Sequence, residues 1–416
     1  MEFVKKIINC RACDSSNLSQ VYKFNDCPIE GDFVTSSNLD KLQPEYPMSS
    51  VICNDCGFLQ LEYLLSPEII YKNYYYETAA TTGLIDHFAE YSKKIVNRFS
   101  LKPNKSLVID IGSNDGGFLN SFKNQNIEIL GIEPSHDISK VANEKGINTF
   151  NSYFDNMAVD YILKNYEKAS LVTSNYMFAN IDNINMFINN VSKILDDNGV
   201  YIIETGYHPD QMNVNMIDWF YHEHFSYFTA KVLDEIMIKS GMKIFDYDNI
   251  NIRGGCIRFY CKKIINKAID INSNVNDLIK NENDSGMHKK ETHINYFSSI
   301  INIKNTIKNK LSEYKTSGKK IVGYGASHST TGLMYLFELS DYIEYLVDDN
   351  PAKLNKFSPG KHKKIFNSTK ITEDNPDVII ILAWLYTKPI LKNLTNFIDN
   401  GGEILIPLPE FKIIKN

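Results

Sequence analysis

The sequence predicts an α/β protein in which a small cysteine-rich module precedes two domains of the Rossmann type. Two Cys-x-x-Cys pairs stand near the amino terminus, and a strand–glycine turn–helix pattern occurs once in the middle of the chain and once near its end. These observations divide the chain at about residues 1–70, 71–305 and 306–416. A chain of 416 residues exceeds what one core usually organises, which agrees with several domains.

Composition and charge are those of an ordinary soluble globular protein. Hydrophobic residues make up 43% and charged residues 23% of the chain, which excludes global disorder. The net charge of -6 argues against broad nucleic-acid binding. No apolar run approaches a bilayer span, and the stretch from Met1 to Lys6 is too short and polar to open a signal peptide. We expect a cytoplasmic protein that binds neither nucleic acid nor membrane; its oligomeric state stays open, with a monomer favoured.

The two cysteine pairs have the spacing of a zinc site. A Cys-x-x-Cys turn lets two thiolates approach one ion, and two such turns complete a tetrahedral sulfur shell. A redox pair is disfavoured because no thioredoxin-like strand and helix surround either turn, and four unliganded thiols are the remaining alternative. Four cysteines leave no coordination position for water, so we predict a structural zinc ion rather than a catalytic one. Its ligands are Cys10, Cys13, Cys53 and Cys56.

The central domain begins with a β-branched strand at residues 106–111, followed by a glycine turn and the start of a helix. A second strand, residues 127–133, ends in Glu133. Glycines allow a close approach of the backbone to a ligand, and a carboxylate at the second strand's end can accept hydrogen bonds from two ribose hydroxyls. The pattern predicts an adenosine cofactor; a purely structural glycine turn is the alternative.

The glycine turn itself indicates which cofactor binds. A dinucleotide site needs Gly-x-Gly-x-x-Gly, whereas this turn reads Asp-Ile-Gly-Ser-Asn-Asp-Gly. Asp115 would repel a pyrophosphate but could pair with the cationic amino-acid part of S-adenosylmethionine. We therefore predict S-adenosylmethionine rather than a nicotinamide cofactor. The expected cofactor-binding residues are Asp110, Gly112, Asn114, Asp115, Gly116 and Glu133, with Asn175 at the end of the strand at residues 171–175.

An aromatic stretch, Trp219 to Phe228, holds two histidines, a glutamate and tyrosines among phenylalanines. Burial among rings would shift the pKa of such groups in a way useful for acid–base chemistry. Strand alternation would separate Tyr221 and Glu223 from the histidines, so we expect a loop at the edge of a pocket. The stretch follows a predicted strand at residues 199–205, and ligands of open α/β sheets lie at the carboxyl ends of strands. An aromatic core segment with inert histidines is the alternative.

Two later glycine-containing segments are candidates for substrate contact. Residues 251–261 predict a strand opened by Gly254 and Gly255, which could face a substrate or form only a hairpin bulge. Residues 319–332 repeat the strand–glycine turn–helix pattern, and further strands are expected at 342–351 and 378–383. Hydroxyls and amides at that helix start suit phosphate oxygens, although a purely structural domain would show the same short motif.

The chain resembles, over essentially its full length, the sugar C-methyltransferases that act on nucleotide-linked 4-keto-deoxyhexoses, typified by the C-3'-methyltransferases of tetronitrose and mycarose biosynthesis. The resemblance rests on the cysteine pairs, VIDIGSNDGGFL, YHEHFSYF, the GG-x-x-R strand, and the VGYGA, VDDNP, SPGKH and LAW segments. It implies a zinc-binding first domain, a central S-adenosylmethionine domain and a last domain that helps to hold the sugar nucleotide.

The resemblance also implies roles for individual residues. Tyr221, Glu223 and His224 match the family's catalytic residues, and we assign to His224 the removal of an acidified hydrogen at C3 of the sugar. Tyr221 would donate to the enolate oxygen, and Glu223 would orient a histidine or a sugar hydroxyl. The expected substrate-binding residues are Tyr76, Asn180, His222, Gly254, Gly255, Arg258, Tyr324, Ser327 and His328.

Three departures from the family pattern bear on the substrate. Asn180 stands where many relatives carry a histidine, Arg253 and Cys256 flank the glycine pair in place of the usual His and Ser, and the segment from Ser327 to Ser329 also differs. The reaction class is therefore better defined than the substrate. A non-methylating epimerase or isomerase is one other possibility, disfavoured by the cofactor turn. A zinc-ribbon binding scaffold is another, disfavoured by Tyr221 to His224.

Overall fold

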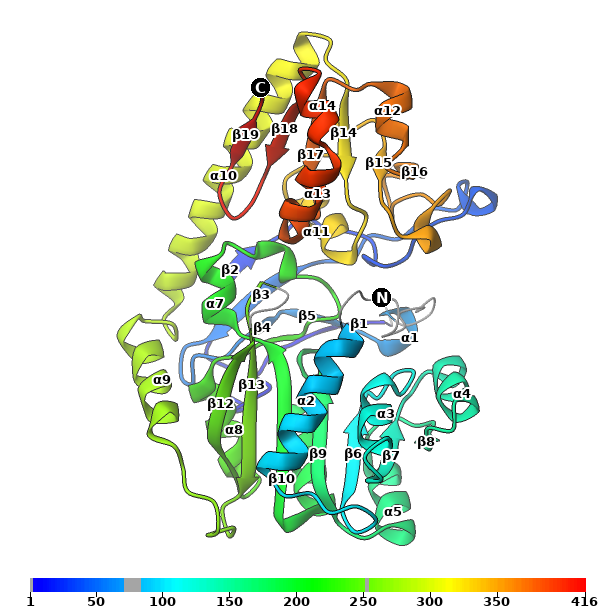
Figure 1. Ribbon diagram of the computed structural model, residues 1–416. Helices are drawn as coiled ribbons and strands as arrows, with labels where there is room; N and C mark the ends of the chain where they lie inside the picture. Colours follow the sequence, from blue (N-terminus) through cyan, green and yellow to red (C-terminus); the bar gives the residue numbers. More distant parts are fainter. Residues whose placement is uncertain (1–2, 71–83, 251–253) are drawn as a thin grey trace.

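The computed structural model describes residues 3–70, 84–250 and 254–416, and it confirms the predicted mixed α/β class (Figure 1). Tyr76 and Arg253, both singled out in the sequence, lie outside the described residues. Among the described residues, no helix combines the length and apolar character that crossing a bilayer requires.

The amino-terminal module is an antiparallel sheet completed by a strand from the middle of the chain. Its strand order is β11-β4-β3-β2, and Ser226 and Tyr227 of β11 pair with Gln60 and Leu59 of β4. A separate two-stranded pair, β1 with β5, precedes a short helix, α1. The bounds are β1 (Val4–Lys6), β2 (Leu18–Lys23), β3 (Ser49–Cys53), β4 (Leu59–Leu61), β5 (Tyr63–Leu65), α1 (Pro67–Ile70) and β11 (Ser226–Tyr227).

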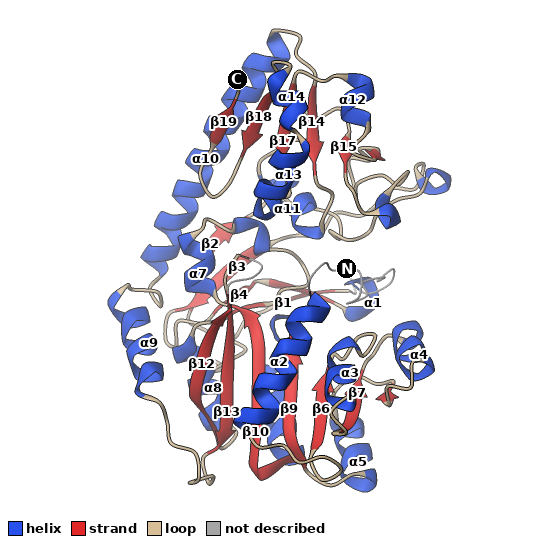
Figure 2. Ribbon diagram, in the orientation of Figure 1, coloured by secondary structure: helices blue, strands red, loops and turns tan. Residues whose placement is uncertain are grey.

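The central domain is built on a seven-stranded sheet with the order β12-β13-β10-β9-β6-β7-β8 (Figure 2). Strands β6 to β10 are parallel, and β13 runs antiparallel to both of its neighbours. The predicted strands at 106–111, 127–133, 171–175 and 199–205 correspond to β6, β7, β9 and β10. The bounds are β6 (Leu107–Ile111), β7 (Glu128–Ile132), β8 (Thr149–Phe150), β9 (Ala169–Asn175), β10 (Leu195–Gly206), β12 (Met242–Ile250) and β13 (Cys256–Lys263).

Helices cover both faces of this sheet. Successive side chains along a strand point to opposite faces, so each strand packs against both layers of helices. In β6, Val108 packs in the core formed with α2, α3 and α4, whereas Ile109 packs in the core formed with α5, α6 and α8. Both faces being buried explains the continuous apolar run of this strand. The helices are α2 (Leu84–Arg98), α3 (Gly117–Lys123), α4 (His136–Glu144), α5 (Asn156–Asn165), α6 (Ile184–Ile194), α7 (His208–Asn213), α8 (Ala230–Lys239) and α9 (Ser273–Asp284).

The long helix α10 (Lys290–Thr316) leads to the carboxyl-terminal domain, and the predicted boundary near residue 305 lies inside it. The sheet order is β16-β15-β14-β17-β18-β19, parallel except for β19. The elements are β14 (Ile321–Tyr324), α11 (His328–Leu336), β15 (Leu346–Val347), β16 (Ile365–Phe366), α12 (Lys370–Asp374), β17 (Val378–Ile381), α13 (Thr387–Asn393), α14 (Thr395–Asp399), β18 (Glu403–Ile406) and β19 (Lys412–Ile414).

The strand expected over residues 342–351 is much shorter than predicted. Only Leu346 and Val347 pair as β15, because the amides of Tyr342 and Ile343 donate to the carbonyl oxygen of Leu339 and close a turn at the end of a helix.

The amino-terminal module and the carboxyl-terminal domain share one core, in which Tyr22, Ile300 and Leu333 are all fully buried. The two ends of the chain are therefore packed as one body.

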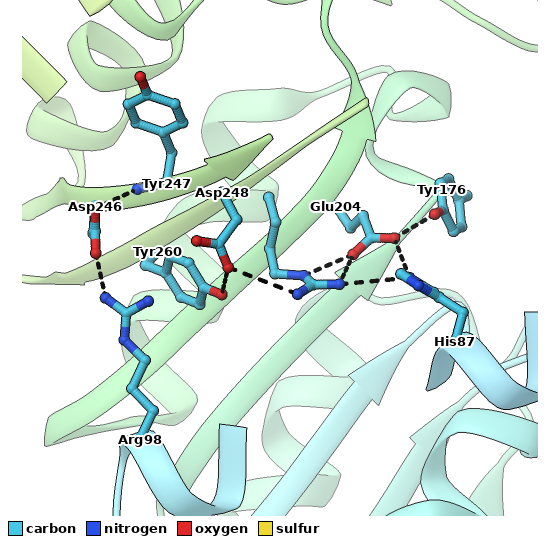
Figure 3. A network of polar contacts seen from close by, with 9 residues as sticks. His87, Arg98, Tyr176, Glu204, Asp246, Tyr247, Asp248 and Tyr260 are labelled. Atoms are coloured by element: carbon cyan, nitrogen blue, oxygen red, sulfur yellow. Dashed lines mark hydrogen bonds and ion pairs between the residues drawn. The ribbon is translucent and has the colours of Figure 1, made fainter. Parts of the chain in front are cut away.

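A buried polar network joins β10, β13 and α2 (Figure 3). Glu204 and Arg258 are register partners on β10 and β13, and Arg258 Nε donates to Glu204 Oε2 at 2.7 Å. Nε2 of His87, on α2, lies 3.0 Å from Glu204 Oε1, and the Tyr176 hydroxyl donates to the same oxygen. The Arg258 guanidinium also lies over the Tyr91 ring, 3.4 Å from its centroid. Arg258 is thus part of the sheet's interior.

Removing the charge of Glu204 should destabilise the fold strongly. Glu204→Gln leaves the Arg258 cation without its buried counter-ion, with only the exposed Asp248 at 3.9 Å, and we expect a loss of about 3–5 kcal/mol in the free energy of unfolding, measured by urea denaturation. Glu338→Gln is the matched control, because Glu338 also meets two cations, Lys304 and Lys308, but its side chain is 44% exposed. That variant should lose about 1 kcal/mol or less. Equal losses in the two variants would contradict the prediction.

Candidate active site

A cavity of about 940 Å³ lies between the amino-terminal module and the carboxyl ends of the parallel strands in the central sheet. Ligands of open α/β sheets bind at this edge. The volume is at the upper end of the range for pockets that hold one ligand, so a cofactor and a substrate can lie side by side. The wall includes Leu64 to Glu68, Asp110 to Asn114, Ile132 to His136, Ser152 to Asp155, Asn175 to Met177, Asn180 to Asn183, Trp219, Tyr221, Glu223 to Phe225, and His328.

At one end of the cavity, Glu133 directly follows β7. Its Oε1 accepts a hydrogen bond from the Ser135 amide at 2.8 Å, and its Oε2 accepts one from the Asn114 amide at 3.0 Å. Burial raises the pKa of Glu133, and these two amide bonds oppose that rise. The carboxylate is therefore held in one orientation at the position where a ribose diol is expected.

Asp110 lies beside it in β6 and is 3% exposed. Its Oδ1 accepts hydrogen bonds from the Thr173 hydroxyl at 2.6 Å and from Asn175 Nδ2 at 3.2 Å. Burial raises the pKa of Asp110 to about 7, although both bonds favour the ionised form. Ligand binding, or a change of pH near neutrality, would therefore change the protonation of Asp110 and with it the charge of this wall.

The residues at this end fit S-adenosylmethionine. Among the described residues, Ser113 Oγ and Asn175 Oδ1 are buried on the cavity wall with no hydrogen-bond partner, and buried polar atoms of this kind are usually satisfied by a ligand or water. Gly112 has φ +73°, and a Cβ there would lie 2.9 Å from Met177 Cγ, so only glycine suits the turn. Asp110, Gly112, Asn114, Glu133 and Asn175 all line the cavity and would hold the cofactor.

The structure does not bring Asp115 and Gly116 to the wall as the sequence analysis expected. Asp115 is 2% exposed, and its Oδ2 accepts a hydrogen bond from Lys145 Nζ at 3.0 Å. A Cβ on Gly116 would lie 2.6 Å from Ile147, so this glycine serves packing behind the turn. Because Asp115 already has a cationic partner, it is not available for the amino group of the cofactor.

The aromatic stretch lies on a loop at the cavity, between the 3-10 helix η4 (Ile217–Trp219) and β11. A turn in which the His224 amide donates to the Tyr221 carbonyl at 3.0 Å brings Tyr221, Glu223 and His224 to the same wall. The sequence prediction of a loop at a pocket edge therefore agrees with the structure. Because this segment is a loop and not a strand, its side chains do not alternate between two faces, and Tyr221, Glu223 and His224 can converge.

The ring of His224 contacts two other rings. Its centroid lies 4.3 Å from that of Trp219 and 4.0 Å from that of Tyr221. Its Nδ1 lies 3.0 Å from the carbonyl oxygen of Trp219. A carbonyl oxygen only accepts, so Nδ1 carries the hydrogen, and the lone pair of the neutral ring is on Nε2. This tautomer is the one that a general base at Nε2 requires.

Glu223 differs from an ordinary surface glutamate in its protonation. It is 7% exposed, and burial, followed by the negative charge of Glu30, raises its pKa to about 8. At neutral pH the side chain is therefore mostly a carboxylic acid, which donates a hydrogen bond as well as accepting one. A neutral acid on the wall suits a ketone or hydroxyl oxygen.

His222 points away from the cavity. The described residues that line the cavity do not include it, and its Nδ1 lies 2.9 Å from Oε1 of Glu30, a buried residue of the amino-terminal module. The His222 amide also donates to both carboxylate oxygens of Glu30. His222 therefore anchors the loop to the module, which corrects the expectation that it contacts substrate.

Two other predicted substrate residues do reach the cavity. Asn180, the last residue of the 3-10 helix η3 (Phe178–Asn180), lines its wall, as does His328, the first residue of α11. The His328 ring centroid lies 6.4 Å from that of Tyr221. A Cβ on Gly31 would lie 2.3 Å from His328 Nε2, so His328 is packed directly against the amino-terminal module. Burial lowers the pKa of His328.

The remaining predicted substrate residues lie elsewhere within the described parts of the chain. Gly254 and Gly255, with φ +78° and +125°, form the turn into β13, and a Cβ on either would overlap Met216 or Asp210. The Tyr324 hydroxyl donates to Asp349, and Ser327 caps α11 through the Thr330 amide. The side chains of Tyr324, Ser327 and Arg258 thus have partners within the protein. Neither they nor the two glycines line the cavity wall. Tyr76 lies outside the described residues.

The four predicted zinc ligands converge away from this cavity. The sulfur atoms of Cys10, Cys13, Cys53 and Cys56 all lie within 4.8 Å of one another, and the pairs Cys10–Cys56 and Cys13–Cys53 are 3.6 Å apart. Tetrahedral zinc–thiolate bonds of about 2.3 Å place sulfurs roughly 3.8 Å apart, so the cluster fits a closed zinc site. The ion would hold together the two turns of the module.

Some residues on or behind the cavity wall were not identified from the sequence as site residues. Tyr176 has φ +57° and lines the cavity, and its position directly after the strand end at Asn175 was the available signal. Trp219 was noted only as part of the aromatic belt. Glu30 gave no signal, because its contact with His222 joins residues 192 positions apart.

Comparisons with known proteins agree with this geometry. Three family models match: a methyltransferase domain over residues 85–246, a "Putative zinc binding domain" over residues 10–71, and a C-methyltransferase C-terminal domain over residues 251–409. C-methyltransferase NovU of Streptomyces niveus is 25% identical over 414 residues, which are 99% of this chain and 98% of that protein.

Solved structures that are similar cover only part of the chain. An S-adenosylmethionine-dependent methyltransferase from Clostridium acetobutylicum is 12% identical, with a TM-score of 0.35, over 47% of this chain and 95% of its own. The PH0226 protein from Pyrococcus horikoshii is 12% identical, with a TM-score of 0.37, over 46% of this chain and 97% of its own.

The sheet order, the cofactor end of the cavity and the cysteine cluster define an S-adenosylmethionine-dependent methyltransferase with a structural zinc site. More narrowly, the carboxyl-terminal part of the chain matches a C-methyltransferase domain, the chain is similar to a C-methyltransferase over almost its full length, and its enzyme class is EC 2.1.1. The predicted C-methyltransferase relationship, cofactor and metal are thereby confirmed, whereas the nucleotide-sugar substrate stays a prediction.

The pair formed by Glu30 and His222 predicts a pH-dependent stability. Burial alone would lower the pKa of His222, but the charge of Glu30 and its hydrogen bond raise it above 6.5; burial alone would raise the pKa of Glu30, but His222 holds it below 4.5. The His222 contribution is complete below its unfolded pKa and is lost as the pH rises through the raised value. The Glu30 contribution is complete above 4.5 and is lost on acidification.

His222→Gln should therefore cost more unfolding free energy at about pH 5.5 than at an alkaline pH above the raised pKa, where the wild-type ring is neutral. Urea denaturation across this range measures the difference. The control is the cost of adding His222→Gln to the Glu30→Gln variant, which should not rise toward pH 5.5 because the counter-charge is already absent. A cost of His222→Gln that is constant with pH would contradict the ionised pair.

Proposed function

We propose that this C-methyltransferase methylates C3 of a nucleotide-linked 4-keto-6-deoxyhexose through an enolate formed by His224. The observation that carries the proposal is the shared wall: Tyr221, Glu223 and His224 lie in one cavity with the cofactor residues Asp110 and Glu133. The family resemblance supplies the substrate class.

His224 acts as the base. A hydrogen at C3 beside a C4 ketone is acidified, because the carbanion that forms delocalises onto the ketone oxygen. The Trp219 carbonyl holds the hydrogen on Nδ1, so Nε2 of His224 takes the proton. Tilted contacts with the rings of Trp219 and Tyr221 hold the His224 ring in place during this transfer.

Two hydrogen-bond donors act on the substrate oxygens. Tyr221 donates to the enolate oxygen, where negative charge develops. Glu223, protonated at neutral pH because burial and Glu30 raise its pKa to about 8, donates to a neighbouring sugar hydroxyl. Both groups are fixed before the reaction, since the turn from Tyr221 to His224 is closed by its own backbone hydrogen bond.

The cofactor and the nucleotide take the two ends of the cavity. When bound, S-adenosylmethionine supplies a methyl group on a sulfonium sulfur, which the substrate carbon takes with formation of a carbon–carbon bond and release of the thioether. Glu133 and Asp110 hold the adenosine end. His328, from the carboxyl-terminal domain, contacts the substrate at the opposite side, next to Tyr221.

The reaction can be tested with a panel of substrates. Incubation with S-adenosylmethionine and thymidine-, guanosine- or cytidine-linked 4-keto-6-deoxyhexoses should give, for one of them, a product heavier by one CH₂ group in mass spectrometry. Isotope-labelled methyl should appear at C3 by NMR. If no sugar gains mass while solvent deuterium enters at C3, the chain is an isomerase and the methylation proposal is wrong.

The role of His224 can be tested by replacing only the ring. His224→Gln retains a polar side chain but has no group that titrates near neutrality, and the methyl-transfer rate should fall by about 10²–10⁴-fold. Cofactor affinity, measured by calorimetry, should stay near that of the wild type, because the cofactor residues lie at the carboxyl ends of β6, β7 and β9. Methyl transfer at the wild-type rate would show that another group is the base.

A further inference from the structure

The first zinc turn carries one long side chain between its two ligands. Arg11 stands between Cys10 and Cys13, and its guanidinium points from the zinc module into the central domain. Nη1 donates to the carbonyl oxygens of Ile181 at 2.8 Å and Asp182 at 3.3 Å. Nη2 donates to the carbonyl oxygen of Phe225 at 2.9 Å and to the Ser226 hydroxyl.

These acceptors belong to two loops that line the cavity. Ile181 and Asp182 directly follow Asn180, and Phe225 directly follows His224. The loops are more than forty residues apart in sequence, as the pair Ile181–Phe225 shows. One guanidinium therefore joins the loop of Asn180 to the loop of His224.

The position of Arg11 is itself fixed from three sides. Gln60 Oε1 accepts hydrogen bonds from both the Arg11 amide and Nε, each at 3.2 Å. Asn185 Nδ2, on α6, donates to the Arg11 carbonyl at 3.0 Å. Lys239 Nζ, on α8, donates to the carbonyl of Ala12 at 2.5 Å. The turn between the zinc ligands is thus anchored to the central domain before the guanidinium makes its contacts.

The chemistry of the side chain explains why arginine stands here. Burial lowers the pKa of Arg11 to about 10, so the group stays protonated at neutral pH. A buried cation must have its donors satisfied, and the planar fork of a guanidinium reaches acceptors on both loops at once. A lysine ammonium is a single point and cannot span the same set.

We propose that Arg11 is a positioning residue for catalysis: it sets the separation between the Asn180 loop and the His224 loop, and so transmits the geometry of the zinc turn to the active site. This inference rests on the proposed function for the role of His224. Arg11 does not contact the reacting atoms. Its effect is to keep the wall of the cavity assembled around the substrate.

The test compares Arg11→Met and Arg11→Lys with a matched control, Arg98→Met. The Arg98 guanidinium also donates to an oxygen, on Asp246, and lies over the ring of Tyr260, but these partners lie outside both loops that Arg11 joins. Each variant is measured for zinc content, for S-adenosylmethionine affinity and for hydrogen–deuterium exchange of backbone amides. Where the substrate panel yields a product, kcat and KM are also measured.

Arg11→Met should retain zinc and bind the cofactor as the wild type does, while amides in residues 178–183 and 221–226 exchange faster. kcat should fall by about 100-fold, with a much smaller change in KM, because misplaced groups cost rate more than binding. Arg11→Lys should recover only part of kcat. Arg98→Met should match the wild type in zinc content, cofactor affinity, kcat and exchange in both loops.

Wild-type exchange in both loops and wild-type kcat in Arg11→Met would overturn the proposal. If Arg11→Met loses zinc or does not fold, Gln60→Met decides: it removes the acceptor that orients Arg11 but no zinc ligand, and unchanged exchange in both loops would overturn the proposal. If no sugar of the panel is methylated, the proposed function fails, whereas the exchange measurements still test the role of Arg11.

Discussion

The pairing of β11 with β4 is the contact on which the active site depends. It places Ser226 and Tyr227, which directly follow the His224 loop, into the sheet of the amino-terminal module. The amide of Leu61 also donates to the carbonyl of Phe225 at 3.0 Å. With η4 at its start and a sheet at its end, the loop has both ends fixed. Its titratable side chains are therefore held in place before substrate arrives.

Buried and half-buried charges elsewhere in the protein also have their partners on different elements. Glu30 meets His222 across the interface with the amino-terminal module, Glu204 meets Arg258 within the central sheet, and Arg11 meets carbonyl oxygens of two loops. Burying ions costs desolvation energy, which well-packed apolar side chains would avoid. We interpret these charged contacts as fixing the relative orientation of the elements that they join. A hydrogen bond to a charged group constrains the angle between donor and acceptor, whereas apolar packing does not.

Local sequence patterns predicted the parts of the fold that depend on local rules. The apolar runs gave β6, β7, β9 and β10, and the acidic end of the second strand gave Glu133 on the cavity wall. Side-chain direction within a turn was harder to predict, because it depends on the partner that the folded chain provides. Asp115 faces Lys145, a residue thirty positions away, and no pattern in the turn reveals this.

The same limit explains the other differences. Arg258 was expected at a substrate because it follows a glycine pair, yet its register partner on β10 is a buried glutamate. Register between strands far apart in sequence cannot be read from either strand alone. Arg11 and Glu30 escaped notice for a related reason, since their partners lie more than 150 residues away. Their importance follows from contacts between domains.

The origin of β11 also has a consequence for the order in which the chain can fold as it is synthesised. All four zinc ligands have been made by Cys56, so the ion can organise the module early. The outer edge of β4, however, has no partner strand until Ser226 and Tyr227 emerge from the ribosome. An open edge with unpaired amides and carbonyls is prone to pairing with other chains. Completion of the first module thus awaits most of the second domain, and a nascent chain halted between these points carries an exposed strand edge.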